Sequence, residues 1–186
     1  MKTATYFQPA SDLTTLYHPD GTTPYPYWNI ILRPSGSINA SAHDMAEYLL
    51  FYLNRGFANG KQIVSASTLE RMEVPTSTWA AKEGLKVGYG LSNYCMIYDG
   101  FVYHGHNGVV WGDLTEMAYM PDFQLGYFYS INSMQPEAYL KIGKILRSYM
   151  TQKLSRQSVS LPESLSSNAA EYTGWYQPNS PRIELS

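Results

Sequence analysis

The sequence predicts an α/β fold of the α+β type, in which an antiparallel sheet of about four to five strands is covered by helices. One amphipathic helix is expected from Ser41 and another from Pro136. Between them, residues 87–131 hold successive β-prone segments joined by short turns, as is typical of antiparallel neighbours. A chain of 186 residues can bury the core that such a fold needs.

The first predicted helix begins at Ser41, where Asp44 gives an acidic variant of the capping box. Gly56 lies where a C-terminal cap belongs. The apolar residues of this helix recur at helical spacing and form one stripe: Met45, Leu49 and Leu53, with Tyr48 and Tyr52 beside it. The stripe predicts that the helix packs on a core.

Two further helices are predicted from their first residues. A short helix is expected from Ser67, because Glu70 follows at capping-box spacing, and it should end before Pro75. The last helix should begin at Pro136 and Glu137, since both residue types are favoured in a first turn. Its apolar stripe is expected to cover the sheet: Tyr139, Ile142, Leu146 and Tyr149.

The β-prone segments lie at residues 87–91, 94–98, 101–112, 114–120 and 125–131. Asp99-Gly100 predicts a tight hairpin, and Pro121-Asp122 predicts a second turn. In residues 125–131 both alternating sets of side chains are largely apolar. A strand of this kind is buried on both faces, which predicts helices on each side of the sheet.

Composition excludes several classes of function. Hydrophobic content of 44% with 15% charged residues indicates a globular chain, and the net charge of -2 gives no electrostatic reason to expect nucleic acid or an acidic membrane. No stretch approaches the ~20 apolar residues of a membrane span. Cys95 is the only cysteine, so an intrachain disulfide and a thiolate metal cluster are excluded. Because Cys95 lies in a β-prone segment, a buried inert thiol is expected rather than a nucleophile. No cofactor is predicted.

The stretch from Tyr103 to Gly108 carries the most chemistry. On a regular strand His104 and His106 share one face, while Tyr103, Gly105 and Asn107 share the other. The glycines weaken a strand and indicate a bulge or a close approach to the backbone. These residues alone are compatible with two interpretations: a structural strand whose two histidines are hydrogen-bonded within the protein, or a functional site.

Several segments resemble the serine β-lactamase-like superfamily of class C β-lactamases, penicillin-binding D-Ala-D-Ala carboxypeptidases and related esterases. They are the small-residue helix entry at 34–46, Gly88-Tyr89-Gly90-Leu91, Gly105-His106-Asn107-Gly108, and the strand segments 118–122 and 130–132. The resemblance covers about residues 30–152 and implies a partial β-lactamase/transpeptidase-like fold. Members that act on cell-wall material are usually exported, but the compartment of this chain stays open.

The resemblance also implies roles for four residues. His106 matches the Lys or His that begins the family's third motif, Asn107 the middle position, and Gly108 the glycine. His106 is therefore expected to be catalytic and to stabilise the surroundings of the nucleophile. The backbone N–H of Val109 is expected to be an oxyanion-hole donor. Asn107 and Gly108 are expected to contact a small-molecule or peptide acyl substrate, with glycine leaving room for its carbonyl.

The nucleophile motif of that superfamily is missing. No serine in the sequence is followed three residues later by lysine, as Ser-x-x-Lys requires. Tyr27-Trp28-Asn29 matches the second motif in letters, but it lies too close to Pro34-Ser35-Gly36 for the family's order. The expectation is a C-terminal portion of such a hydrolase, inactive alone, whose nucleophile lies upstream of Met1.

The predicted organisation follows from this. Residues 1–154 are expected to be the C-terminal portion of the domain, beginning with loops and short extended pieces up to about residue 40. Residues 155–170 read as a linker, and residues 171–186 as the truncated start of a β-rich module. The absent N-terminal portion is an expected partner. Its absence should leave a strand edge exposed, through which a homodimer could form.

Two alternatives compete with the hydrolase reading. One is a non-catalytic module on the same fold that binds peptide or glycan or regulates another protein. The other is a metal site built from His104, His106, Asp113 and Glu116, because histidines at i and i+2 of a strand can share a metal.

Overall fold

The computed structural model describes residue 4 and residues 13–27, 30, 35–36, 38–76, 78–82, 87–155 and 174. Its helices and strands run in the order α1 (Ala42–Leu53), β1 (Phe57–Ala58), β2 (Lys61–Gln62), α2 (Ala66–Glu73), α3 (Trp79–Lys82), β3 (Gly88–Tyr89), β4 (Tyr94–Tyr98), β5 (Phe101–Val110), β6 (Asp113–Met120), the 3-10 helix η2 (Pro121–Phe123), β7 (Leu125–Ile131) and α4 (Pro136–Thr151).

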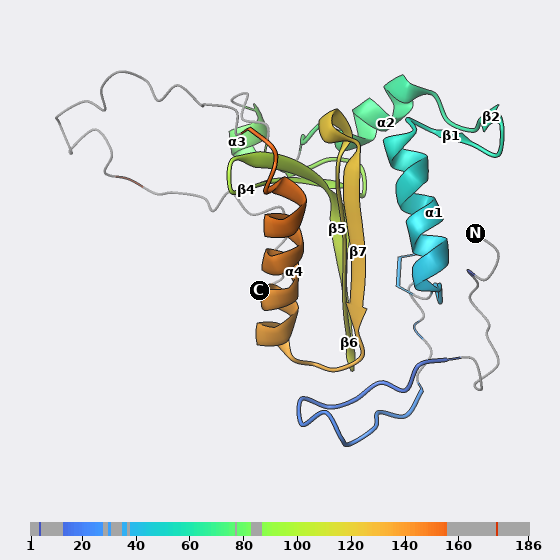
Figure 1. Cartoon of the computed structure of the whole chain (residues 1–186), viewed down its shortest axis with the longest axis vertical. Coiled ribbons are helices and arrows are strands. Elements are labelled where there is room, and N and C mark those ends of the chain that lie inside the picture. The colour runs from blue at the N-terminus through green and yellow to red at the C-terminus, as the bar shows by residue number, and fades with distance from the viewer. Residues whose placement is uncertain are drawn as a thin grey trace.

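The described residues form a five-stranded antiparallel sheet in the order β3-β4-β5-β6-β7, together with a separate β1-β2 ribbon. Helices α1 and α4 lie on opposite sides of the β5-β6-β7 part of the sheet (Figure 1). The predicted α+β class and the predicted number of strands are both confirmed. So is the prediction, drawn from residues 125–131, that helices lie on each side.

Helix α1 begins as its sequence predicts. The Ser41 side chain accepts a hydrogen bond from the Asp44 backbone N–H at 3.1 Å, so the N-cap is confirmed. The helix ends at the cap residue Asn54, two residues before Gly56, whose φ of +85° suits glycine. The buried residues of this side of the sheet form one core cluster: Leu49, Tyr52 and Leu53 of α1, Leu69 of α2, and Met117 and Tyr119 of β6.

The predicted start of α2 is wrong by two residues. Ser65, not Ser67, is the N-cap, and its side chain accepts a hydrogen bond from the Thr68 N–H at 3.2 Å. Ser65 has the extended backbone that a cap requires, with φ of -64° and ψ of 150°. The predicted end is confirmed, because Val74 is already extended before Pro75.

The predicted β4 and β7 match the structure, and the turn between β4 and β5 is confirmed by positive φ values at Asp99 (52°) and Gly100 (84°). Strand β3 is shorter than predicted. The Gly90 N–H bonds to the Asn93 carbonyl, and the Leu91 N–H bonds to the Met72 carbonyl of α2, so the chain turns there instead of continuing the strand.

Helix α4 begins at Pro136 as predicted and covers the other face of the sheet. A second core cluster lies there: Phe101, Tyr103, Ala118, Met120 and Tyr127, packed against Leu146, Met150 and others. Within this face Arg147 of α4 contacts Glu116 of β6 at 3.1 Å, and both side chains are nearly buried.

Two predictions about the chain ends fall largely outside the described residues. Apart from Ser155 and Gly174, the structure does not describe the predicted linker or the predicted β-rich module, so both stay predictions. Within the described ranges, no helix combines the length and the apolar character needed to cross a membrane.

Candidate active site

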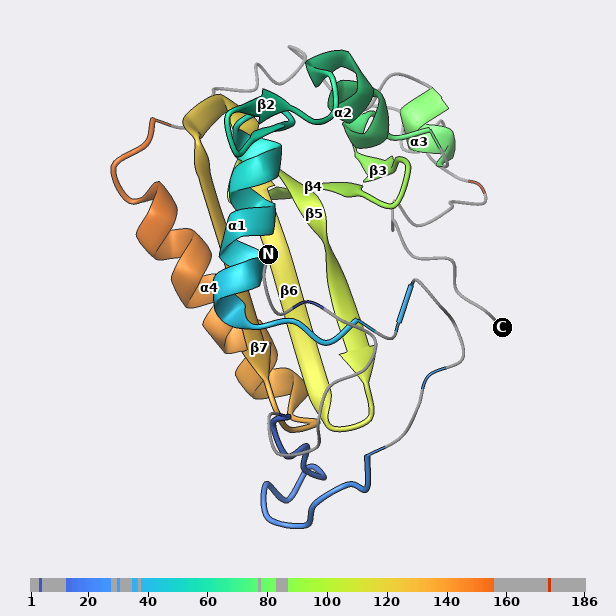
Figure 2. The same ribbon diagram turned by 90° about the vertical axis from the view of Figure 1, so that its right-hand side faces the viewer.

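Strand β5 extends beyond β4, which is its neighbour on one side. Strand β4 pairs with residues 101–105 of β5, whereas β6 pairs with residues 104–110. Figure 2 shows β4 beside only the upper part of β5. Among the described residues, none forms a ladder with residues 106–110 on the β4 side. The segment Gly105-His106-Asn107-Gly108 therefore runs from a paired strand into an edge that has no strand partner in the described part of the chain, called the open edge below.

The side chain of Asn93 marks the point where pairing stops. Asn93 is 1% exposed, and its Oδ1 accepts a hydrogen bond from the Gly105 N–H at 3.0 Å. The Gly105 N–H therefore points toward the β4 side of β5. Because N–H directions alternate along a strand, the N–H of Val109 points the same way. It faces the open edge, and the Val109 side chain is 60% exposed.

His106 lies at the beginning of this edge with an exposed side chain. Its Nδ1 contacts the backbone oxygen of Asn107, and its Nε2 lies 2.6 Å from the Tyr89 hydroxyl. A carbonyl only accepts, so Nδ1 carries the proton, and in the neutral ring Nε2 accepts from the Tyr89 O–H. Burial raises the pKa of Tyr89, which keeps its hydroxyl protonated.

The two glycines beside His106 have neighbours on β6. Gly105 has a φ of +150°, and a Cβ added there would lie 2.0 Å from the Met117 carbonyl oxygen. A Cβ at Gly108 would lie 2.5 Å from the Thr115 Oγ1. Packing against the β6 backbone is therefore enough to require glycine at position 105, whereas at position 108 only the Thr115 side chain would have to shift. The predicted contact of Gly108 with an acyl carbonyl stays a prediction.

His104 occupies a different environment from His106. The register places His104 opposite Tyr119 and His106 opposite Met117, so the two histidines share one face of the sheet, as predicted. It is the face covered by α1, because Tyr119 and Met117 pack in the same core cluster as α1. His104 is half-buried, and burial lowers its pKa below the ordinary 6.5, with Glu73, Arg55 and Asp122 acting on it electrostatically. Its buried Nδ1 has no hydrogen-bond partner within the described chain.

The residues of the metal alternative are not brought together. Glu116 lies opposite Asn107, on the face away from His106, and its carboxylate accepts from Tyr127 at 2.6 Å and Tyr129 at 2.9 Å. Asp113 accepts a hydrogen bond from Ser130 at 2.7 Å. The part of the chain that the structure describes holds no group of three or more side chains placed to bind a metal. The geometry does not support this alternative.

Two residues near the site were not singled out from the sequence. Tyr89 was noted only as part of Gly88-Tyr89-Gly90-Leu91, and its contact with His106 joins residues far apart in the chain. Asn93 lies between the β-prone segments 87–91 and 94–98. A polar residue between two β-prone segments is a weak signal, because such residues are ordinarily exposed. Cys95 is a buried residue of β4, as expected. Of the second-motif match, Trp28 and Asn29 lie outside the described residues.

No family model matches the sequence, and no curated protein matches it. The fold is similar to a solved structure, the octameric penicillin-binding protein homologue from Pyrococcus abyssi, with a TM-score of 0.63 and 23% sequence identity. The match covers 82% of this chain and 35% of that chain. At this identity the similarity shows the fold alone, so the chain has a fold like part of a penicillin-binding protein homologue.

Proposed function

We propose that β5 forms one wall of an acyl-transfer site of the penicillin-binding-protein and β-lactamase type. In such a site a serine is acylated by a β-lactam, a D-Ala-D-Ala peptide or an ester, and water then releases the acyl group. The observation that carries the proposal is the open edge of β5, where the Val109 N–H points outward and His106 lies three residues before it.

The chemistry assigned to this edge is electrostatic. When the serine oxygen attacks the acyl carbon, the carbonyl oxygen becomes an oxyanion, and the Val109 N–H is one of its two donors. His106, held by Tyr89 and by the Asn107 carbonyl, supports the charge near the nucleophile. Asn107 and Gly108 contact the acyl substrate between these two groups.

In this proposal the nucleophile and its base come from polypeptide that this sequence does not contain. No Ser-x-x-Lys occurs in the 186 residues. The chain also spans only 35% of the penicillin-binding protein homologue that it resembles in fold. We therefore expect no hydrolysis of a chromogenic cephalosporin or a p-nitrophenyl ester by these residues alone.

The test uses the gene product extended upstream as far as an in-frame Ser-x-x-Lys. Val109→Pro removes the proposed oxyanion donor and should lower kcat by about 10²–10³. Val109→Ala keeps the N–H and should stay close to the parent. Proline is tolerated at an open strand edge, and circular dichroism checks that the fold is kept. His106→Ala should also lower kcat, while His43→Ala, at an 82% exposed side chain of α1, should not.

Equal activity of Val109→Pro and Val109→Ala would contradict the proposed oxyanion role. The absence of any upstream Ser-x-x-Lys would favour the alternative, a non-catalytic peptide- or glycan-binding module on the same fold. That alternative rests on one observation, the lack of the nucleophile motif within this sequence.

A further inference from the structure

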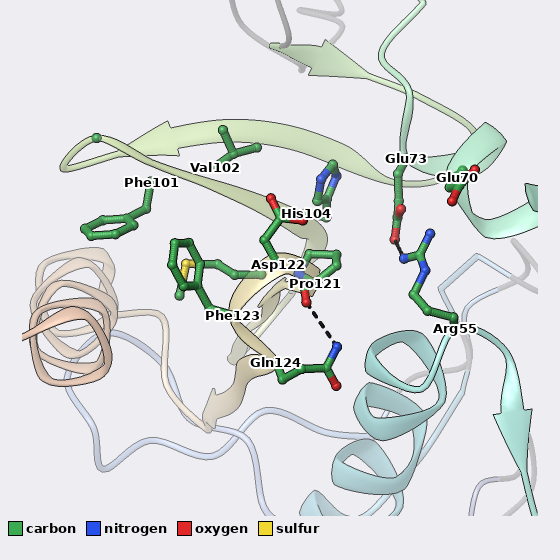
Figure 3. Close-up of a pocket in the computed structure, with 12 residues that line it drawn as sticks. Arg55, Glu70, Glu73, Phe101, Val102, His104, Pro121, Asp122, Phe123 and Gln124 are labelled. Carbon is green, nitrogen blue, oxygen red and sulfur yellow. Dashed lines mark hydrogen bonds and ion pairs between the residues drawn. The ribbon is translucent and has the colours of Figure 1, made fainter. Parts of the chain in front are cut away.

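A pocket of about 390 Å³ lies at the other end of β5, away from the open edge. It lies between the first residues of β5, the 3-10 helix η2 and the loop and helix that carry Arg55, Glu70 and Glu73 (Figure 3). Its lining includes none of His106, Asn107, Gly108 or Val109. It is therefore separate from the proposed acyl-transfer wall. Its volume lies within the range of small-molecule sites, about 300–1,000 Å³.

One side of the pocket is apolar and aromatic. The rings of Phe101 and Phe123 meet edge to face, with their centroids 5.7 Å apart. Val102 lies above them in Figure 3 and is 37% exposed, and Pro121 also lines the pocket. Phe101 is buried in the core, so this side offers a ligand the ring of Phe123 and the aliphatic carbons of Val102 and Pro121.

The pocket also carries acidic side chains, with Glu70 and Glu73 on the other side and Asp122 beside Pro121 and Phe123 (Figure 3). The lining holds one arginine and three carboxylates, those of Glu70, Glu73 and Asp122, which leaves two negative charges in excess. Arg55 pairs with Glu73 at 2.8 Å, and Tyr119 donates a second hydrogen bond to the same carboxylate. Glu73 is thus already neutralised and hydrogen-bonded. The excess charge belongs to the two exposed carboxylates, Glu70 and Asp122.

His104 lies between the two sides, with Asp122 on one flank and Glu73 on the other (Figure 3). Burial lowers its pKa, so at neutral pH the ring is uncharged and adds no positive charge to the pocket. A cation that enters therefore meets carboxylates and a neutral imidazole. The Arg55 guanidinium is already engaged by Glu73.

We propose that this pocket binds a small organic cation, an ammonium or guanidinium group carried on an apolar body. The apolar body lies on Phe123 and Val102, with the buried ring of Phe101 packed behind Phe123. The cationic group lies toward Asp122, which is next to Phe123 in the chain and has an exposed carboxylate, so Coulomb attraction favours a cation and would disfavour an anion of the same shape. The proposal does not depend on the acyl-transfer function.

The test is an NMR titration of the purified 186-residue chain at pH 7 with three ligands that share a phenyl ring: phenethylamine, 2-phenylethanol and 3-phenylpropionate. Only phenethylamine is a cation. We expect saturable shifts in residues 100–104 and 121–124, with the cation binding at least about tenfold more tightly than the anion. Added salt should reduce this preference, because the carboxylates are exposed.

Matched variants locate the site. Asp122→Asn should weaken phenethylamine binding about threefold to fivefold, as expected for one partly solvated ion pair. Glu137→Gln removes a carboxylate at the start of α4, at the far end of the sheet, and should not change binding. Val102→Lys places a positive charge at the pocket and should abolish binding, whereas Val102→Leu should keep it.

The absence of saturable shifts up to about 10 mM would overturn the proposal, since even a weak small ligand of this size should bind by then. Equal affinity for phenethylamine and 3-phenylpropionate would overturn it too. So would equal effects of Asp122→Asn and Glu137→Gln. None of these outcomes bears on Val109, so failure here and failure of the acyl-transfer proposal can be told apart.

Discussion

The β4–β5 ladder ends at the pair Tyr94 and Gly105, and there the side chain of Asn93 accepts a hydrogen bond that a strand carbonyl would otherwise accept. The Oδ1 of Asn93 accepts from the Gly105 N–H, and its Nδ2 donates to the Tyr119 hydroxyl at 2.8 Å. Tyr119 in turn donates to Glu73, which pairs with Arg55. One buried amide thus joins the beginning of the candidate site to the ion pair beside the pocket, with each polar atom on this path hydrogen-bonded.

The first residue-scale prediction concerns Tyr89. Tyr89→Phe removes the donor to His106 Nε2 but leaves the contact of Nδ1 with the Asn107 carbonyl. The ¹⁵N signal of Nε2 should move toward that of a free imidazole acceptor, while Nδ1 keeps its proton. Long-range ¹H–¹⁵N spectra of the histidine rings measure this directly. Unchanged Nε2 signals would show that the Tyr89 contact is not made in solution.

The second residue-scale prediction concerns His104 and pH. Burial holds the folded pKa of His104 below the ordinary 6.5, so on acidification the unfolded chain takes up the proton first. The stability contribution of the neutral ring is complete above pH 6.5 and is lost as the pH falls toward the folded pKa. His104→Gln should therefore lose less stability than the parent between pH 7.5 and 5.5.

Urea unfolding at several pH values measures this difference, whose slope cannot exceed about 1.4 kcal/mol per pH unit for one proton. His43→Gln is the control, because the His43 side chain is 82% exposed. If His104→Gln and the parent lost stability equally, burial of His104 could not be the cause of the pH dependence.

Among the elements, α4 is held to the sheet by a buried polar cluster as well as by apolar contacts. Arg147 donates to Glu116 at 3.1 Å and to the Tyr127 hydroxyl at 2.9 Å, and its guanidinium lies 4.2 Å from the centre of the Tyr98 ring. Tyr127 and Tyr129 donate to the same carboxylate. These two tyrosines belong to β7, so Glu116 depends on the docking of α4 for its cation and not for these two hydrogen bonds.

Arg147→Met should lower the free energy of unfolding by about 3–5 kcal/mol, because it leaves the Glu116 carboxylate buried without its cation. Lys144→Met changes an exposed lysine one turn earlier on α4 and should cost less than about 0.5 kcal/mol. Denaturant unfolding of both variants gives the comparison. A near-neutral Arg147→Met would mean that water reaches Glu116.

The strands were largely predictable from local sequence, and the contacts that build the candidate site were not. Asp99-Gly100 fixes a turn by its own backbone preference, and alternation fixes which residues share a face. The predicted α2 cap is two residues too late, because Ser65 and Ser67 are equally good cap residues and only the backbone geometry distinguishes them. The contact of Tyr89 with His106 and the pocket around His104 depend on side chains that only the folded sheet brings together.

At the scale of the molecule, β7 is the last strand of the sheet within the described residues. Helices cover the two faces of the sheet at β7, but they do not pair with its outer edge. In the described part of the chain, the N–H and C=O groups along that edge have no strand partner. An edge of this kind favours pairing with another chain. The octameric state is a property of the structural neighbour.

We expect the 186-residue chain to self-associate through this edge or by strand exchange. Sedimentation velocity over a hundredfold range of concentration should show a species larger than the monomer at the upper end. Addition of the upstream polypeptide proposed above should suppress it by covering β7. A monomer at every concentration, with a cooperative melt, would contradict the expectation.

The stop that Asn93 imposes on the β4–β5 ladder also bears on fibril formation. Within the part of the chain that the structure describes, residues 106–110 of β5 have no strand partner on that side, and Gly108 lies in the middle of them. Segments that stack into cross-β fibrils are typically about six or seven residues long and poor in glycine. The open half of β5 is therefore long enough to hold one short extended ligand and too short to seed a fibril.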